Sequence, residues 1–185
     1  SEVEEVIRRI RALVEEIARK NEDILRKNRK LLEDLRELVE RVIKEIKELI
    51  DRLADEVRRV KDKETVKKLI DDIRKRVEKL AEDLTRLIKE IKDRSRKTLE
   101  EAHKLNRDII RDIRRLLEEL RKRVKDDRVR KEVEEVLRDV EERIRRLDEE
   151  VRRRAEESER ELERLREKVE DMIEKVKRAL EELRR

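Results

Sequence analysis

The sequence predicts an all-α protein, an antiparallel up-down-up bundle of three long helices, and three observations lead to that prediction. The chain has no glycine, proline or aromatic residue, and 60% of its residues are charged. Its apolar residues recur at steps of three and four for tens of residues, as one face of a helix requires. The pattern breaks twice, near residues 61–64 and 125–127, which divides the chain into three segments of similar length.

The first helix is predicted over about residues 2–60. A second apolar row beside its main stripe widens the face to the breadth needed to pack against two neighbours. That row consists of Ala18, Leu25, Leu32 and Val39. The main stripe consists of Val3, Ile7, Ile10, Val14, Ile17, Ile24, Leu31, Leu35, Leu38, Val42, Ile46, Leu49, Leu53, Val57 and Val60.

The second and third helices are predicted over about residues 64–124 and 128–184. Asp62, and Asp126 or Asp127, precede the restarts of the pattern, so we expect them to be helix N-caps. The short connections require neighbouring helices to run antiparallel. The apolar step averages about 3.6 residues, which predicts nearly straight helices. Because composition shifts nowhere along the chain, residues 1–185 are expected to form a single domain.

Polar residues interrupt the apolar stripes near the middle of the chain. They are Asn21 and Asn28 in the first helix, Ser95, Thr98, His103 and Asn106 in the second, and Ser158 in the third. Residues at the same height on antiparallel neighbours have numbers that sum to about 125 across the first turn and about 253 across the second. The polar residues should therefore gather in two adjacent layers.

We hypothesise two hydrogen-bond networks, because a buried polar group without a partner costs on the order of 1–3 kcal/mol. One would hold Asn28, Ser95, Thr98 and Ser158, and the other would hold Asn21, His103 and Asn106. Such layers penalise slipped registers and wrong topologies in an otherwise uniform core. In the alternative interpretation, the serine and threonine hydroxyls donate to the carbonyl four residues back in their own helix.

The sequence offers little for catalysis or metal binding. His103 with Glu100 would supply only two ligands, and Ser95 lies about 12 Å along the helix from His103, too far for a nucleophile and its base. We therefore expect no enzyme activity, no metal site and no cofactor. If His103 is buried in its neutral form, folding stability should fall as the pH falls, because the unfolded chain would bind the proton more readily.

The charge pattern does not favour nucleic acid or a membrane as a partner. The chain has 58 basic and 53 acidic residues, which are interleaved, and it has no aromatic side chain to stack on bases. The longest apolar run, Ala12–Val14, is far below the ~20 residues that span a bilayer. We expect a soluble protein without a targeting signal. With no cysteine, the sequence does not indicate a compartment.

Three equal helices, an aliphatic core, Glu/Lys/Arg surfaces, Asp-capped turns and layered core polar residues together resemble computationally designed helical bundles with buried hydrogen-bond networks. The resemblance covers the whole chain, although such designs often have glycine or proline in their turns. It implies a stable scaffold, monomeric or oligomeric, with no natural substrate and no required partner. It carries over no functional residue.

A second function remains open beside the scaffold. The first helix has more apolar residues than the third, so its wide face could serve self-association, as a homo-oligomer, or the binding of a further helix. The mass of the protein in solution distinguishes the two functions.

Overall fold

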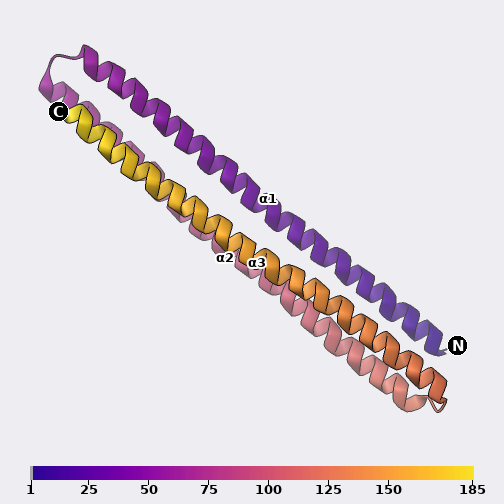
Figure 1. Cartoon of the computed structure of the whole chain (residues 1–185). Helices are drawn as coiled ribbons and strands as arrows, with labels where there is room; N and C mark the ends of the chain where they lie inside the picture. Colours follow the sequence, from indigo (N-terminus) through magenta and orange to yellow (C-terminus); the bar gives the residue numbers. More distant parts are fainter. Residues whose placement is uncertain (1) are drawn as a thin grey trace. The chain divides into compact units, whose positions relative to one another are not determined.

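The computed structural model describes residues 2–185, which form three helices and no strand. The helices are α1 (Glu2–Arg59), α2 (Lys63–Arg123) and α3 (Asp127–Arg184). They pack against one another as a three-helix bundle (Figure 1). The predicted fold class is therefore confirmed, and each helix begins and ends within one residue of the predicted boundary.

Charges at the helix ends support each helix. The first turn of α1 contains Glu2, Glu4 and Glu5, and its last turn contains Arg58 and Arg59. Acidic side chains at an N-terminus and basic side chains at a C-terminus interact favourably with the helix dipole. With glycine and proline absent, every helical position keeps a residue that tolerates helix geometry.

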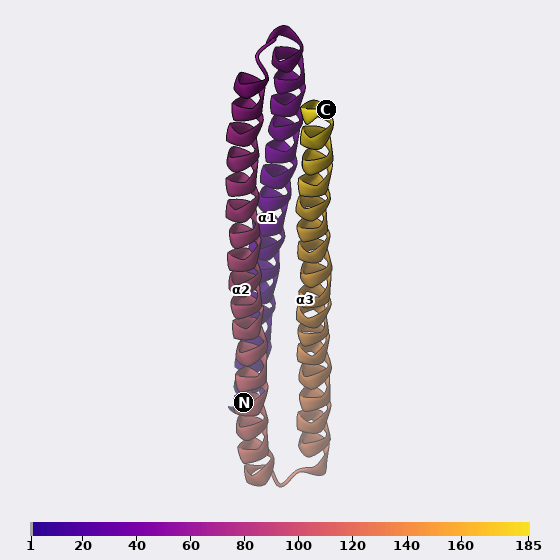
Figure 2. The same ribbon diagram turned by 90° about the vertical axis from the view of Figure 1, so that its left-hand side faces the viewer.

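The two turns span three residues each, Val60–Asp62 and Val124–Asp126, and both can be followed in Figure 2. Among residues 2–185, none has a positive φ angle. The chain therefore reverses direction without the left-handed residue, usually glycine, that commonly ends a helix. In the second turn, Arg130 Nε donates to the carbonyl of Val124 at 2.9 Å and satisfies one group at the end of α2.

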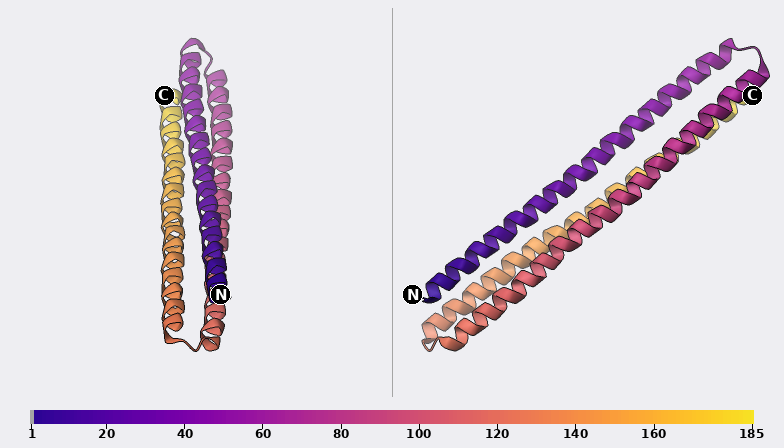
Figure 3. Two further views of the ribbon diagram at one scale, coloured as in Figure 1. Left: turned by 90° about the vertical axis from the view of Figure 1, so that its right-hand side faces the viewer. Right: turned by 180° about the vertical axis from the view of Figure 1, so that it is seen from behind.

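Contacts divide the chain into two compact units, each of which contains a segment of all three helices. The first unit holds residues 2–29 and 94–157, and the second holds residues 30–93 and 158–185. Within each unit, helices consecutive in the chain run in opposite directions, as the colours in Figure 3 show. The boundaries fall inside helices and not in linkers, so the single domain stays a prediction.

The core of the first unit consists of two apolar clusters. The larger has Ile10, Ile113 and Val133 among its most buried members. The smaller is built from Leu25, Leu99, Ala102 and Val151, with Ile24 and Ala155 packed against it. All of these side chains are aliphatic, so their contribution to stability comes from apolar burial and close packing.

The core of the second unit is one continuous cluster. Val39, Ile46, Ile70 and Val169 are each at most 1% exposed, and leucines and valines from all three helices surround them. Met172, the one methionine of the chain, also belongs to this cluster. Packing within this apolar cluster is set by the shapes of its side chains.

Candidate functional site

The polar residues that interrupt the core are the candidate site. The buried ones are Asn21, Asn28, Ser95, Asn106, Arg154 and Ser158. Among the described residues, every buried side-chain nitrogen and oxygen atom has a hydrogen-bond partner. In the first unit the partners form two groups, which we name the Asn21 layer (Asn21, Asn106, Asp148 and His103) and the Asn28 layer (Asn28, Ser95 and Arg154).

The Asn21 layer is centred on a reciprocal pair of amides. Asn21 Nδ2 donates to Asn106 Oδ1 at 2.7 Å, and Asn106 Nδ2 donates to Asn21 Oδ1 at 2.8 Å. Asn21 Nδ2 also donates to the carbonyl of Ile17 at 2.9 Å. Both asparagines are 1% exposed. A shift of either helix along its axis would break both bonds together.

Asp148 and His103 extend this layer towards the surface. Asp148 Oδ1 lies 2.5 Å from His103 Nδ1 and 3.5 Å from Asn106 Nδ2, so one carboxylate oxygen of α3 contacts two side chains of α2. The His103 side chain is 38% exposed, and that of Asp148 is 22% exposed. The expectation of a buried His103 ring is therefore wrong, because the ring lies partly exposed at the edge of the core, beside Asp148.

The Asn28 layer joins all three helices. Asn28 Nδ2 donates to Ser95 Oγ at 2.6 Å, and Arg154 Nε donates to Asn28 Oδ1 at 2.9 Å. Arg154 also forms an ion pair with Glu157, at 3.3 Å, and it is only 7% exposed. A buried guanidinium requires such partners, because removing a charge from water costs several kcal/mol. Deleting one partner of a buried ion pair typically reduces the free energy of unfolding by about 3–5 kcal/mol.

The two remaining residues of the hypothesised networks are Thr98 and Ser158. The hydroxyl of Thr98 donates to the carbonyl of Arg94 at 2.9 Å, so it is satisfied within its own helix and not by Asn28. This is the local alternative considered from the sequence, which a threonine facing partly outward favours. Ser158 is 2% exposed and belongs to the second unit.

Sequence reasoning missed two charged members of these layers, Asp148 and Arg154. Arg154 falls on the buried row of α3 that runs through Leu147, Val151 and Ser158 at steps of three and four. Arginine is rarely buried, so the apolar pattern gave no reason to place Arg154 in the core. Asp148 could have been found, because residues at the same height on α2 and α3 have numbers that sum to about 253. That sum places Asp148 level with the segment between His103 and Asn106.

The two aspartates expected to cap helices precede α2 and α3. Asp62 Oδ1 accepts the backbone N–H of Glu64 at 3.2 Å, and Asp62 Oδ2 accepts the Thr65 hydroxyl at 2.8 Å. Asp126 Oδ1 accepts the backbone N–H of Arg128 at 3.0 Å. A side-chain oxygen that accepts the N–H two residues later has the geometry of an N-cap.

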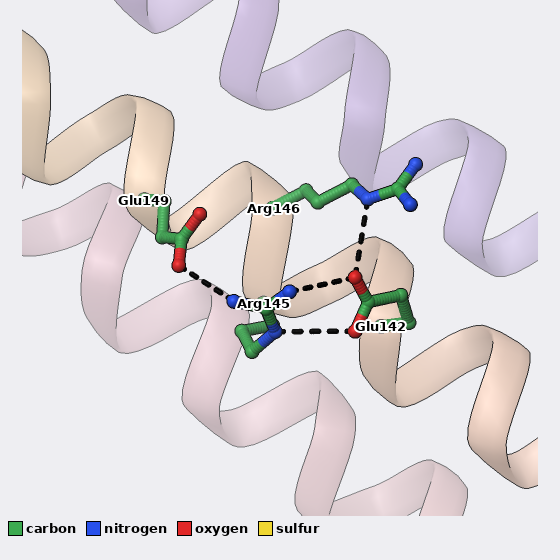
Figure 4. Close-up of polar contacts among 4 residues, drawn as sticks. All are labelled: Glu142, Arg145, Arg146 and Glu149. Carbon is green, nitrogen blue, oxygen red and sulfur yellow. Dashed lines mark hydrogen bonds and ion pairs between the residues drawn. The ribbon is translucent and has the colours of Figure 1, made fainter.

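The exposed face of α3 carries a dense group of ion pairs, shown in Figure 4. Arg145 donates to Glu142 and to Glu149, each at 2.6 Å, and Arg146 donates to Glu142 at 3.3 Å. The hydrogen bond from Arg145 lowers the pKa of Glu142, and the same bond raises the pKa of Arg145. On α1, the hydrogen bond from Lys27 lowers the pKa of Asp23. These pairs are solvated, so they contribute to helix stability and form no enclosed site.

The described residues contain no cluster of three or more histidine, aspartate or glutamate side chains that could hold a metal ion. A groove of about 650 Å³ lies beside the Asn21 layer in the first unit, where Ile110 and Ile144 are among its lining residues. Arginines and carboxylates line the rest of it, and Asp148, at its edge, is engaged by His103. In residues 2–185 there is also no helix of sufficient length and apolarity to cross a membrane.

The chain was compared with known proteins and with known protein families. No curated protein matches the chain. A solved structure described as a "Computationally designed three helix bundle" has a TM-score of 0.57 and 21% sequence identity, and the match covers 99% of this chain and 89% of that chain. The resemblance to designed helical bundles is thereby confirmed for the fold.

The family model of the apolipoprotein B100 insert 9 arm domain matches residues 1–123. The match ends with the last residue of α2, so it covers the α1–α2 hairpin and excludes α3. Because this match covers more than half of the chain, the chain belongs to the family of the apolipoprotein B100 insert 9 arm domain.

Proposed function

We propose that the chain is a designed structural scaffold with no natural biochemical activity, and that its buried polar layers specify the register of its helices. The similarity to a designed three-helix bundle supports the scaffold role. The family match covers α1 and α2 and assigns no functional residue to this chain.

The observation that carries the proposal is the reciprocal bond between Asn21 and Asn106. In an aliphatic core, moving one helix by a heptad exchanges one leucine or valine for another and loses little packing energy. The same movement takes each amide away from its partner and leaves two buried polar groups unsatisfied, at about 1–3 kcal/mol each. The layer therefore favours one register over its neighbours.

Cross-linking tests the register directly, because the native chain has no cysteine. Glu2 lies 3.7 Å from Arg123 across the α1–α2 pair. The variant Glu2→Cys/Arg123→Cys reports the native register, and Glu2→Cys/Leu116→Cys reports a slip of one heptad. Replacing Asn21, Asn28 and Asn106 by leucine should raise the slipped product at least about tenfold. An unchanged ratio in a fully helical variant would refute the register role.

The second candidate is a self-associating or helix-binding module that uses the wide apolar face of α1. In the second unit, Val42, Ile43 and Ile50 of α1 are only partly buried against the core. Absolute mass measured by light scattering decides between the two. A single species at 22.9 kDa supports the scaffold, and a multiple of that mass supports self-association.

A further inference from the structure

The polar layers fix the height of each helix but leave one choice open. In an up-down-up bundle of three helices, α3 can pack on either side of the α1–α2 hairpin. A residue keeps the same height in both arrangements, so Asn21 and Asn106 lie level in either of them. A second device must therefore select the side on which α3 packs.

We propose that two charged rows in the first unit make this selection, one acidic on α3 and one basic on α2. The acidic row has a residue at every seventh position, and it consists of Glu134, Glu141 and Asp148. The basic row consists of Arg121, Arg114 and His103.

The two rows meet at three successive heights. Arg121 lies 3.5 Å from Glu134, and Arg114 Nε donates to Glu141 at 2.7 Å. At the third height, His103 Nδ1 forms a hydrogen bond with Asp148 Oδ1. Each exposed pair is weak alone, but all three depend on the same side of α3 facing α2, so they act in the same direction.

The opposite side of α3 carries positive charge towards α1. Arg143 lies 3.4 Å from Glu15, and Arg154 donates to Asn28. Arg143 and Arg154 are eleven residues apart, about three full helical turns, and therefore share one side of α3. Asp148 lies six residues before Arg154, about 120° around the helix, on the other side.

In the opposite arrangement, each helix keeps its apolar face inward, so its two sides exchange partners. The acidic row would turn from α2 to α1, and Arg143 would turn from α1 to α2. All the contacts described above would be lost together. Arg154, which is 7% exposed, would also leave the side on which it meets Asn28. The observed arrangement is favoured by complementary charge, independently of the register that the proposed function assigns to the asparagines.

Two cysteine pairs report the two arrangements. Glu15→Cys/Arg143→Cys joins α1 to α3 as observed. Asp112→Cys/Arg143→Cys reports the opposite arrangement, because Asp112 is eleven residues from Arg123, which faces Glu2 of α1. A short bis-maleimide cross-linker, with products quantified by mass spectrometry, gives the ratio of the two yields. The native background should favour the first pair.

The decisive variant is Glu134→Arg/Glu141→Arg, which sets basic residues of α3 against the basic row of α2. We expect the ratio of yields to shift towards the opposite arrangement by roughly five- to tenfold. Adding Arg114→Glu/Arg121→Glu should restore it. The matched control, Glu135→Arg/Glu149→Arg, changes the charge equally at exposed positions and should shift the ratio less than about twofold.

An unchanged ratio in the row variant, with full helicity by circular dichroism, would overturn the proposal, as would an equal shift in the control. The register pairs keep this result separate from the proposed function. If the asparagine substitutions alter register and the row variant does not alter the arrangement, the layers act as proposed and the rows do not. The reverse result would retain the rows and refute the layers.

Discussion

The two units of the bundle use the same helices but build different cores. The second unit has one continuous apolar cluster and the buried Ser158, whereas the first has two apolar clusters and the polar groups of the Asn21 and Asn28 layers. Apolar contacts are non-directional, so a continuous cluster gains stability from burial in several registers. Hydrogen bonds are directional, so the buried polar groups of the first unit find their partners in few registers. With the register role that we propose for the polar layers, stability and specificity are concentrated in different parts of one chain.

The largest expected effect tests whether the aliphatic cores of the two units are equally well packed. Ile46→Ala in the second unit and Ile10→Ala in the first each truncate a side chain that is 1% exposed. Each should reduce the free energy of unfolding by about 2–5 kcal/mol, from lost transfer energy and the cavity that remains. Urea denaturation measures both. A loss below about 1 kcal/mol for only one variant would show that this region packs loosely.

The next effect tests the polar part of the first unit through its buried charge. Asn28→Leu removes the acceptor of Arg154 Nε and the donor to Ser95. It should cost about 1.5–3 kcal/mol, because the buried guanidinium loses a partner. Adding Arg154→Met removes the charge and should recover most of that loss. If the double variant is less stable than Asn28→Leu, Arg154 stabilises the bundle through contacts other than Asn28.

In the Asn21–Asn106 pair, removing one partner should also reduce the free energy of unfolding, by a smaller amount. Asn21→Leu leaves Asn106 with one partner fewer, and we expect a cost of about 1–2 kcal/mol. The variant Asn21→Leu/Asn106→Leu makes the pair apolar, like the second unit, and should be as stable as the native protein or more so. Thermal and urea unfolding of the native protein, both single variants (Asn21→Leu and Asn106→Leu) and the double variant gives the coupling energy. Additive losses would contradict a directional pair.

The helix caps offer one test in each unit. Asp62→Ala in the second unit and Asp126→Ala in the first each remove a carboxylate that accepts a backbone N–H. Each should cost about 0.5–2 kcal/mol. Asp62→Asn and Asp126→Asn are the controls, since asparagine also caps well. If alanine and asparagine variants are equally stable, the side-chain bonds do not stabilise the helices.

The smallest effect concerns pH and lies in the first unit. Hydrogen bonds from Lys27 and Arg145 lower the pKa values of Asp23 and Glu142 in the folded protein. Their contribution is therefore present above the ordinary values of 3.8 and 4.5 and is lost as the pH falls towards the lowered ones. The difference in urea midpoint between native and Glu142→Gln proteins should shrink between pH 6 and about pH 3. A difference that grows on acidification would contradict this sign.

The helices and turns were predictable because each follows from local chemistry. The breaks at Lys61–Glu64 and Lys125–Asp127 locate the turns, and periodicity alone identifies the inward face. In antiparallel helices joined by a short turn, the residue numbers at one height have a fixed sum. This sum places Asn21 near Asn106 and Asn28 near Ser95.

The burial of Arg154 was not predictable in the same way. Most arginines of this chain are exposed, Arg153 among them, and the arginine side chain itself does not mark Arg154 as buried. The Thr98 hydroxyl has a choice between a neighbouring helix and the carbonyl of Arg94, and only the rotation of α2 decides it.

The sequence by itself determined the class of fold, the three helices, their direction and the height of each polar residue. These follow from periodicity, turn length and the fixed rise of a helix. Only the tertiary structure decided which side of α3 faces α2 and which faces α1, and hence that Asp148 meets His103 while Arg154 meets Asn28. The physical reason is that height is a property of one helix and its turn, whereas the side that a charge faces depends on how all three helices pack together.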